Sequence, residues 1–124
     1  MITILTIFLP YPPSINKAFY TDFEAKTRHK SKEYRDWVKL ANQYLMCQRK
    51  DYFTGIIKIE YEVYKPDNRK RDLSNLLKVL DDFLVANKII EDDSKIHDFR
   101  MFWSKEEPKA EWHGAKITIY ADRN

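Results

Sequence analysis

The hydrophobic pattern of the chain changes its period between residues 56 and 84, and this change most constrains the fold. In residues 56–64, IIKIEYEVY, apolar and charged side chains alternate, which predicts a strand with one buried face. Residues 73–84 instead carry apolar side chains three and four positions apart, as on one side of a helix. A chain that combines such a strand with such a helix is expected to adopt an α/β fold.

The rest of the chain predicts three further strands, one further helix and a long loop. Residues 1–9, MITILTIFL, are apolar at almost every position, which predicts a strand covered on both faces. A helix is expected at residues 32–48, with Ser31 as its N-cap. Further strands are expected at residues 97–104 and 115–121. Residues 14–30 show no clear period and are interpreted as a long loop.

The predicted order is therefore β-α-β-α-β-β, a two-layer α/β arrangement of a mixed sheet and two helices. A length of 124 residues corresponds to one domain, and we expect residues 1–124 to form it. A hydrophobic content of 44% with 15% aromatic residues is typical of a packed globular chain.

Several features indicate a cytoplasmic location. Cys47 is the single cysteine and cannot form an internal disulfide, which fits a reducing compartment. The chain lacks an apolar run of 18 residues, so no membrane partner is expected. Its apolar N-terminus has no basic lead-in and no small-residue cleavage site, unlike a signal peptide.

Composition and spacing exclude several kinds of catalytic site. With two glycines in the chain, a glycine-rich loop that binds phosphate or a dinucleotide cofactor is excluded. His29, His97 and His113 lie far apart, without cysteine or histidine partners at zinc-ligand spacing. No serine stands in a G-x-S-x-G context, so a hydrolase of that kind is not indicated. The formal charge of +3 is only mildly basic, so the positions of the charges matter more than their sum.

The most distinctive charges lie in residues 69–83, RKRDLSNLLKVLDDF. On a helical wheel the leucines form one stripe, while Asp72, Asn75, Lys78 and Asp82 form a polar seam along its flank. More acidic groups follow that helix, in Glu91-Asp92-Asp93.

Carboxylates beside cations suit a nuclease site. Mg²⁺ is commonly held by a few carboxylates, waters and substrate phosphates, and phosphodiester hydrolysis needs such a metal. Nearby Lys and Arg are useful when the substrate is polyanionic. A structural interpretation stays open, with Asp72 as a helix N-cap, Asp92 and Asp93 as turn residues, and residues 69–71 as a solvated basic patch.

Four longer segments resemble those of a known family. The segment PDNRKRDLSNLLKVLDDF, followed by IIEDDSKI, is similar to the central motif of the RusA family of Holliday-junction resolvases. LPYPPSINKAFY and SKEYRDWV are similar to that family's proline-rich N-terminal segment and first helix. The resemblance implies a dimeric bacterial or phage endonuclease that binds branched DNA and uses Mg²⁺ or Mn²⁺. It would resolve four-way junctions with paired symmetric nicks.

The resemblance also implies roles for individual residues. Asp72 and Asp93 fall on catalytic, metal-binding aspartates of the family, Lys78 on its essential lysine, and Asn75 on its asparagine. Ser74 departs from the pattern, because the family has a further catalytic aspartate at that position. A serine hydroxyl is neutral, so this change is expected to weaken metal binding.

Three consequences of Ser74 remain open. Asp92 or Glu91 could supply the missing carboxylate, an extra water could take its place, or the chain could bind junctions and scarcely cut them. The alternative function is thus a non-catalytic or weakly catalytic junction-binding protein.

The basic residues and the oligomeric state complete the predictions. A homodimer would match the two-fold symmetry of a junction, and Val79 and Val85 are candidates either for its contact or for packing under a loop. The residues expected to bind DNA phosphates are Lys17, Arg28, Lys30, Arg69, Lys70 and Arg71.

Overall fold

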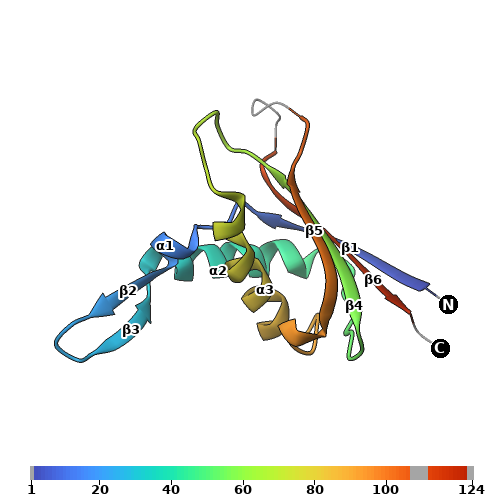
Figure 1. Cartoon of the computed structure of the whole chain (residues 1–124), viewed down its shortest axis with the longest axis horizontal. Helices are drawn as coiled ribbons and strands as arrows, with labels where there is room; N and C mark the ends of the chain where they lie inside the picture. Colours follow the sequence, from blue (N-terminus) through green and yellow to red (C-terminus); the bar gives the residue numbers. More distant parts are fainter. Residues whose placement is uncertain (1, 107–111, 123–124) are drawn as a thin grey trace.

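The computed structural model describes residues 2–106 and 112–122, and its central feature is a four-stranded sheet (Figure 1). Its spatial order is β1-β6-β4-β5. Strand β6 is antiparallel to both β1 and β4, whereas β5 is parallel to β4. The predicted mixed sheet is confirmed, although Met1 of the first predicted strand lies outside the described residues. The four strands are β1 (Ile2–Pro10), β4 (Ile57–Tyr64), β5 (Ile96–Trp103) and β6 (Gly114–Asp122).

Two main helices, α2 (Lys32–Met46) and α3 (Leu77–Ala86), pack on one face of this sheet. Parallel strands need a crossover connection, and α3 lies in the connection between β4 and β5. The predicted cap of α2 is confirmed, because the Ser31 hydroxyl accepts a hydrogen bond from the Tyr34 N–H over 3.1 Å. None of the described helices has the length and apolar character needed to cross a membrane.

Two short 3₁₀ helices flank α3. The first, η1 (Leu73–Leu76), leads directly into α3, so the helix expected behind Asp72 begins with a tighter turn. The second, η2 (Asp93–Lys95), leads into β5. The candidate acidic residues lie at the starts of these two helices, Asp72 before η1 and Asp92 and Asp93 at η2.

The long loop predicted for residues 14–30 is wrong. This segment contains the short helix α1 (Ile15–Ala18) and the antiparallel strands β2 (Phe19–Asp22) and β3 (Thr27–Lys30). These strands form a hairpin that projects from the helical layer (Figure 1). Most of its side chains are exposed, so the hydrophobic periodicity that reveals strands packed on a core is missing here.

The first strand was expected to be covered on both faces, and this is also wrong. Leu5, Ile7 and Leu9 of β1 are buried, whereas Ile2 and Ile4 on the opposite face are 67% and 52% exposed. The cause is the position of the strand. β1 lies at an edge of the sheet, and the helices cover only one of its faces.

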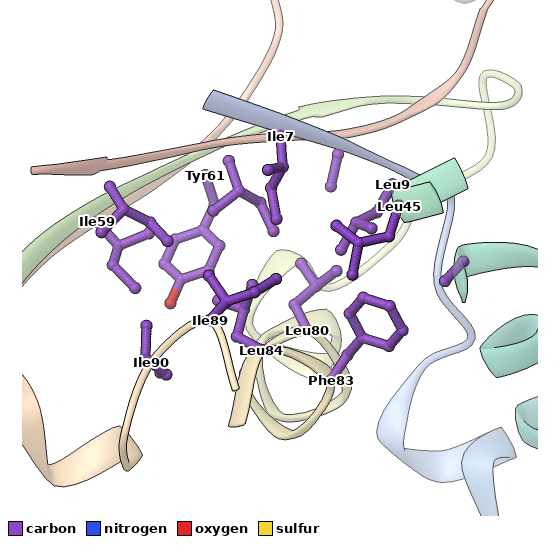
Figure 2. Close-up of a cluster of buried hydrophobic side chains, with 14 of the residues drawn as sticks. Ile7, Leu9, Leu45, Ile59, Tyr61, Leu80, Phe83, Leu84, Ile89 and Ile90 are labelled. Atoms are coloured by element: carbon purple, nitrogen blue, oxygen red, sulfur yellow. The ribbon is translucent and has the colours of Figure 1, made fainter. Parts of the chain in front are cut away.

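The hydrophobic core lies between the sheet and the two main helices (Figure 2). Leu80, Phe83 and Leu84 of α3 face Ile59 and Tyr61 of β4 across it. Burying each such side chain contributes about 1.5–3 kcal/mol to stability.

The two valines proposed as dimer contacts belong to this layer. Val79 is fully buried in the core of its own chain, so its suggested role in a dimer contact is wrong. Val85 is partly buried and packs against the core.

Candidate active site

Asp72 lies immediately before η1, and its side chain is exposed. It occupies the N-cap position of η1, as predicted, but its carboxylate makes no capping hydrogen bond. Instead, the side-chain amide of Asn75 donates to Asp72 Oδ2 over 3.4 Å. Residues three apart lie above one another in a 3₁₀ helix, which explains this pairing. The tighter turn therefore leaves Asp72 available to solvent, with Asn75 beside it.

Lys78 continues the polar seam one turn further along. Its ammonium group forms an ion pair with Asp82 at 2.9 Å, an i,i+4 contact on the surface of α3. The hydrogen bond from Lys78 to Asp82 is the main reason that the pKa of Lys78 is raised, and the charge of Asp93 adds to it. Lys78 is thus held in its cationic form, close enough to Asp93 to feel its charge.

The adjacent residues Asp92 and Asp93 have different surroundings. Asp92 accepts hydrogen bonds from the N–H and hydroxyl of Ser94, and these bonds lower the pKa of its carboxyl group. Asp92 therefore serves as the cap of η2. Asp93 is exposed, and its carboxylate makes no hydrogen bond or ion pair within residues 2–106 and 112–122. Both residues are exposed, and of the two Asp93 has the carboxylate that is not engaged by hydrogen bonds in the described residues.

The fold returns Asp93 to the flank of α3, although it follows that helix in the chain. Lys78 and Asp93 line one hollow of about 450 Å³ together with residues of α2 and β3. Asp72 and Asn75 line a different hollow of about 430 Å³, beside the proline-rich segment. Asp72 and Asp93, both assigned to metal binding by the resemblance, therefore line different hollows. In the described part of the chain, no group of three or more His, Cys, Asp or Glu side chains is placed to hold a metal ion.

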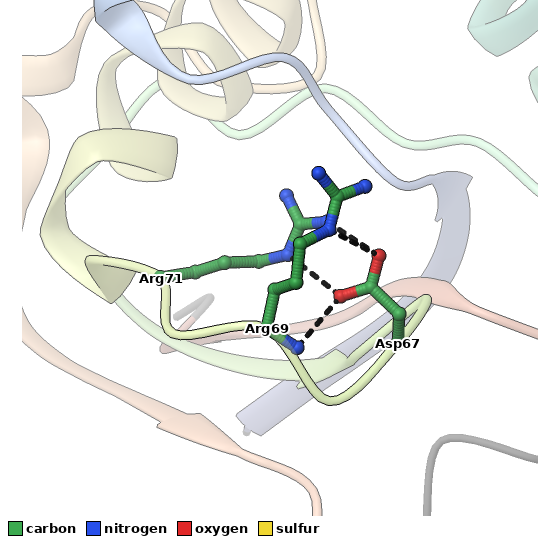
Figure 3. A network of polar contacts seen from close by, with 3 residues as sticks. All are labelled: Asp67, Arg69 and Arg71. Atoms are coloured by element: carbon green, nitrogen blue, oxygen red, sulfur yellow. Dashed lines mark hydrogen bonds and ion pairs between the residues drawn. The ribbon is translucent and has the colours of Figure 1, made fainter.

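The basic loop before η1 is organised by Asp67 (Figure 3). Arg71 Nη2 lies 2.7 Å and Arg69 Nε 3.2 Å from Asp67 Oδ2, and the Arg69 N–H also donates to this carboxylate. These hydrogen bonds, that of Arg71 first, lower the pKa of Asp67 to about 2. The Arg71 guanidinium also lies over the ring of Tyr11, 5.5 Å from its centroid. The sequence interpretation gave Asp67 no role, yet it fixes the positions of both arginines.

The other predicted DNA-binding residues lie around both hollows. Lys17, Arg69 and Arg71 line the hollow of Asp72, and Lys70 is exposed in the same loop. Lys30 lines the hollow of Asp93. Arg28 lies further out on the hairpin, with its guanidinium 4.1 Å from the centroid of the Phe19 ring.

One polar pair was missed by the sequence interpretation. Tyr61 of β4 donates a hydrogen bond from its hydroxyl to Oδ1 of Asp81 on α3. Burial is the main cause that raises the pKa of Asp81 to about 6, and the charges of Asp93 and Asp82 raise it further. Burial also raises the pKa of Tyr61. Perturbed carboxyl groups of this kind are frequent at functional sites. In the sequence, Asp81 was noticeable only as a second aspartate next to Asp82, which gives no indication that its side chain is buried.

Comparison with known proteins identifies the family. A sequence model described as "Endodeoxyribonuclease RusA" matches residues 10–119, which include every candidate site residue described above. The chain belongs to the RusA family. The family predicted from the four segments is therefore confirmed.

Curated relatives agree with this assignment. The "Crossover junction endodeoxyribonuclease rusA" of Enterobacteria phage HK97 is 33% identical over 111 residues, which cover 89% of this chain and 90% of the relative. The protein of that name from Escherichia coli strain K12 is 35% identical over 102 residues, covering 77% and 79%. That from Enterobacteria phage 82 is 36% identical over 101 residues, covering 77% and 78%. The similarity to RusA proteins thus extends along most of both chains.

Proposed function

We propose that this chain is a metal-dependent, structure-selective endonuclease that resolves four-way DNA junctions by paired symmetric nicks. The relatives named as crossover junction endodeoxyribonucleases support this substrate. The observation that carries the proposal is the hollow in which Lys78 and the accessible Asp93 lie together, on a surface edged by basic side chains. A phosphodiester strand laid along the seam of α3 would pass both hollows.

The donor atoms of this surface suit Mg²⁺ or Mn²⁺. Hard divalent cations bind carboxylate oxygens and complete their coordination with waters and substrate phosphates. Asp72 and Asp93 offer exposed carboxylates, and these two would hold the metal, with Asp92 as a third candidate. Because Asp72 and Asp93 line different hollows, their side chains would have to come together when metal and DNA bind. When bound, the metal would supply an activated water and neutralise charge on the leaving oxygen. Lys78 would contact a phosphate oxygen, and Asn75 would orient Asp72 through the hydrogen bond between them.

Ser74 supports a second candidate function. Its side chain is exposed on η1, where the resemblance implies a catalytic aspartate. Asp92 is already engaged by Ser94, which makes it a weaker replacement than a free carboxylate. A chain with one fewer metal ligand could retain the phosphate-binding surface and cut slowly or not at all. The alternative is therefore a junction-binding protein with little or no nuclease activity.

We infer a homodimer as the working unit. A four-way junction has two-fold symmetry, and two identical sites related by a two-fold axis are the simplest way to nick opposing strands. A dimer also doubles the number of basic side chains that face the DNA, which increases affinity for a polyanion.

One experiment tests both candidate functions. A labelled synthetic four-way junction is incubated with Mg²⁺ or Mn²⁺ and with wild type, Ser74→Asp or Asp93→Asn. Gel shifts in EDTA report binding without cutting. Symmetric nicks by the wild type that are lost in Asp93→Asn would support the resolvase. Tight binding with nicking only by Ser74→Asp would support the junction-binding protein. An absence of preference for the junction over duplex DNA would contradict both.

A further inference from the structure

We propose that Lys30 is a second cation at the phosphate that is cut, acting beside Lys78. This inference rests on the proposed nuclease function and deepens it. Sequence alone indicated only a general contact with the DNA backbone, equivalent to those of Lys17 or Arg28. The structure instead separates Lys30 from these residues and places it in the hollow of Asp93.

The lining of that hollow carries the proposal. Lys30 comes from the end of β3, Lys78 from α3 and Asp93 from η2, so three separate elements contribute side chains to one surface depression. Arg28 does not line this hollow, and Lys17 lines the other one. A phosphate that contacts Lys78 inside the hollow therefore lies in a depression that Lys30 also lines.

Tyr34 holds Lys30 in this position. The Lys30 ammonium lies over the Tyr34 ring, 5.3 Å from its centroid, a favourable cation–π arrangement. Tyr34 also lines the hollow. Its pKa is raised mainly by burial and further by the charge of Asp82, whereas the charge of Lys78 lowers it. The same ring thus lies near Lys78 and Asp82 and beneath Lys30.

The hairpin β2–β3 projects from the helical layer, but hydrogen bonds hold the backbone next to Lys30 against α1. The N–H of Ser31 donates to the carbonyl of Ala18 over 2.8 Å, and the Ser31 hydroxyl donates to the carbonyl of Lys17 over 2.7 Å. The ring of Phe19, opposite Lys30 in the hairpin, packs edge-on against Tyr34 at 5.4 Å. Lys30 lies at this anchored base of the hairpin, so the body of the fold positions its backbone beside the hollow, and the Tyr34 ring contacts its ammonium group.

Charge balance explains why a second cation is needed. The charged residues lining the hollow are two lysines and three aspartates, so the formal charge is −1 with Lys30 and −2 without it. Lys78 is already paired with Asp82, whereas no ion pair within the described ranges involves Lys30. Lys30 therefore brings the uncommitted positive charge that an entering phosphate requires.

The test compares three variants with the wild type in single-turnover cleavage of a synthetic four-way junction, at protein concentrations that saturate binding. Lys30→Ala removes the cation, and Lys30→Arg restores it. Lys32→Ala is the matched control, because Lys32 lies two residues away, is exposed and pairs with Asp36 at 3.0 Å. Gel shifts in EDTA and thermal unfolding confirm that each variant binds the junction and is folded.

Lys30→Ala is expected to cut at least about tenfold more slowly at saturation, since removing a single electrostatic contact to a reacting group costs about that factor or more. Lys30→Arg should recover most of the rate, and Lys32→Ala should cut at the wild-type rate. Cleavage by Lys30→Ala at the wild-type rate once the DNA is saturated would overturn the inference alone. Failure of the wild type to nick would overturn the proposed nuclease function and this inference with it.

Discussion

The buried pair of Tyr61 and Asp81 makes stability depend on pH in a way that can be calculated. Asp81 has a pKa of about 6 in the folded chain, against 3.8 for an unperturbed carboxyl group, mainly because of burial. For an acid whose pKa is raised by folding, the stabilising contribution is complete below pH 4. It is lost as the pH rises through 6. The difference of about 2 pH units corresponds to a loss of about 3 kcal/mol at pH 8.

Asp81→Asn tests this value. Asparagine stays neutral at every pH, and its side-chain oxygen can still accept the hydrogen bond of Tyr61. We expect wild type and variant to have similar free energies of unfolding at pH 4. At pH 8 the variant should be more stable by about 3 kcal/mol. Urea unfolding in EDTA from pH 4 to 8, followed by tryptophan fluorescence, measures the difference.

Asp36→Asn is the control for this experiment. Asp36 is exposed on α2, and its hydrogen bond with Lys32 lowers its pKa, so its substitution should give no gain in stability at high pH. A difference between Asp81→Asn and wild type that stays constant from pH 4 to 8 would refute the reasoning. So would a variant that is less stable than wild type at pH 8, because the buried charge would then be favourable.

Four further changes have defined outcomes. Tyr61→Phe should reduce the free energy of unfolding more at pH 8 than at pH 4 in urea titrations, because the hydroxyl bonds the ionised carboxylate more strongly. Leu80→Ala, at a fully buried position, should cost about 2–5 kcal/mol in the same assay. Arg71→Ala should weaken junction binding and reduce the slope of log affinity against log salt by about one, measured by gel shift. Asp93→Asn should abolish nicking in denaturing gels while binding in EDTA persists, and unchanged nicking would show that the site is assigned wrongly.

Sequence periodicity identified the elements that pack on the core. The alternation in residues 57–63 and the leucine stripe of α3 both arise from burial on one face, so strand and helix were predicted correctly. The hairpin β2–β3 was missed because most of its side chains are exposed and therefore carry no periodic signal. For β1, the apolar residues were recognised, but the sequence does not encode that helices cover only one side of this edge strand.

The surface positions of the candidate residues could be predicted from helical spacing, but their arrangement relative to one another could not. The polar seam of α3 followed from helical spacing, and Lys78 does pair with Asp82 one turn away. The positions of Lys30 and Asp93 in one hollow depend on how β3, α3 and η2 meet, which no local pattern specifies. The same holds for Asp81, whose environment is created by Tyr61 twenty residues earlier in the chain.

The backbone at Ser74 determines what a restored carboxylate could do. In a 3₁₀ helix residues three apart are eclipsed, and residues two apart point to different sides. The hydrogen bond between Asn75 and Asp72 places these two side chains together, whereas Ser74, one residue before Asn75 in η1, points about a third of a turn away from Asn75. A carboxylate at position 74 could join Asp72 only around a ligand that lies between the two side chains, not one directly above Asn75. Gain of nicking in Ser74→Asp would thus locate the metal between these side chains. An inactive Ser74→Asp, beside an active wild type, would place it nearer Asn75 and the hollow of Asp72.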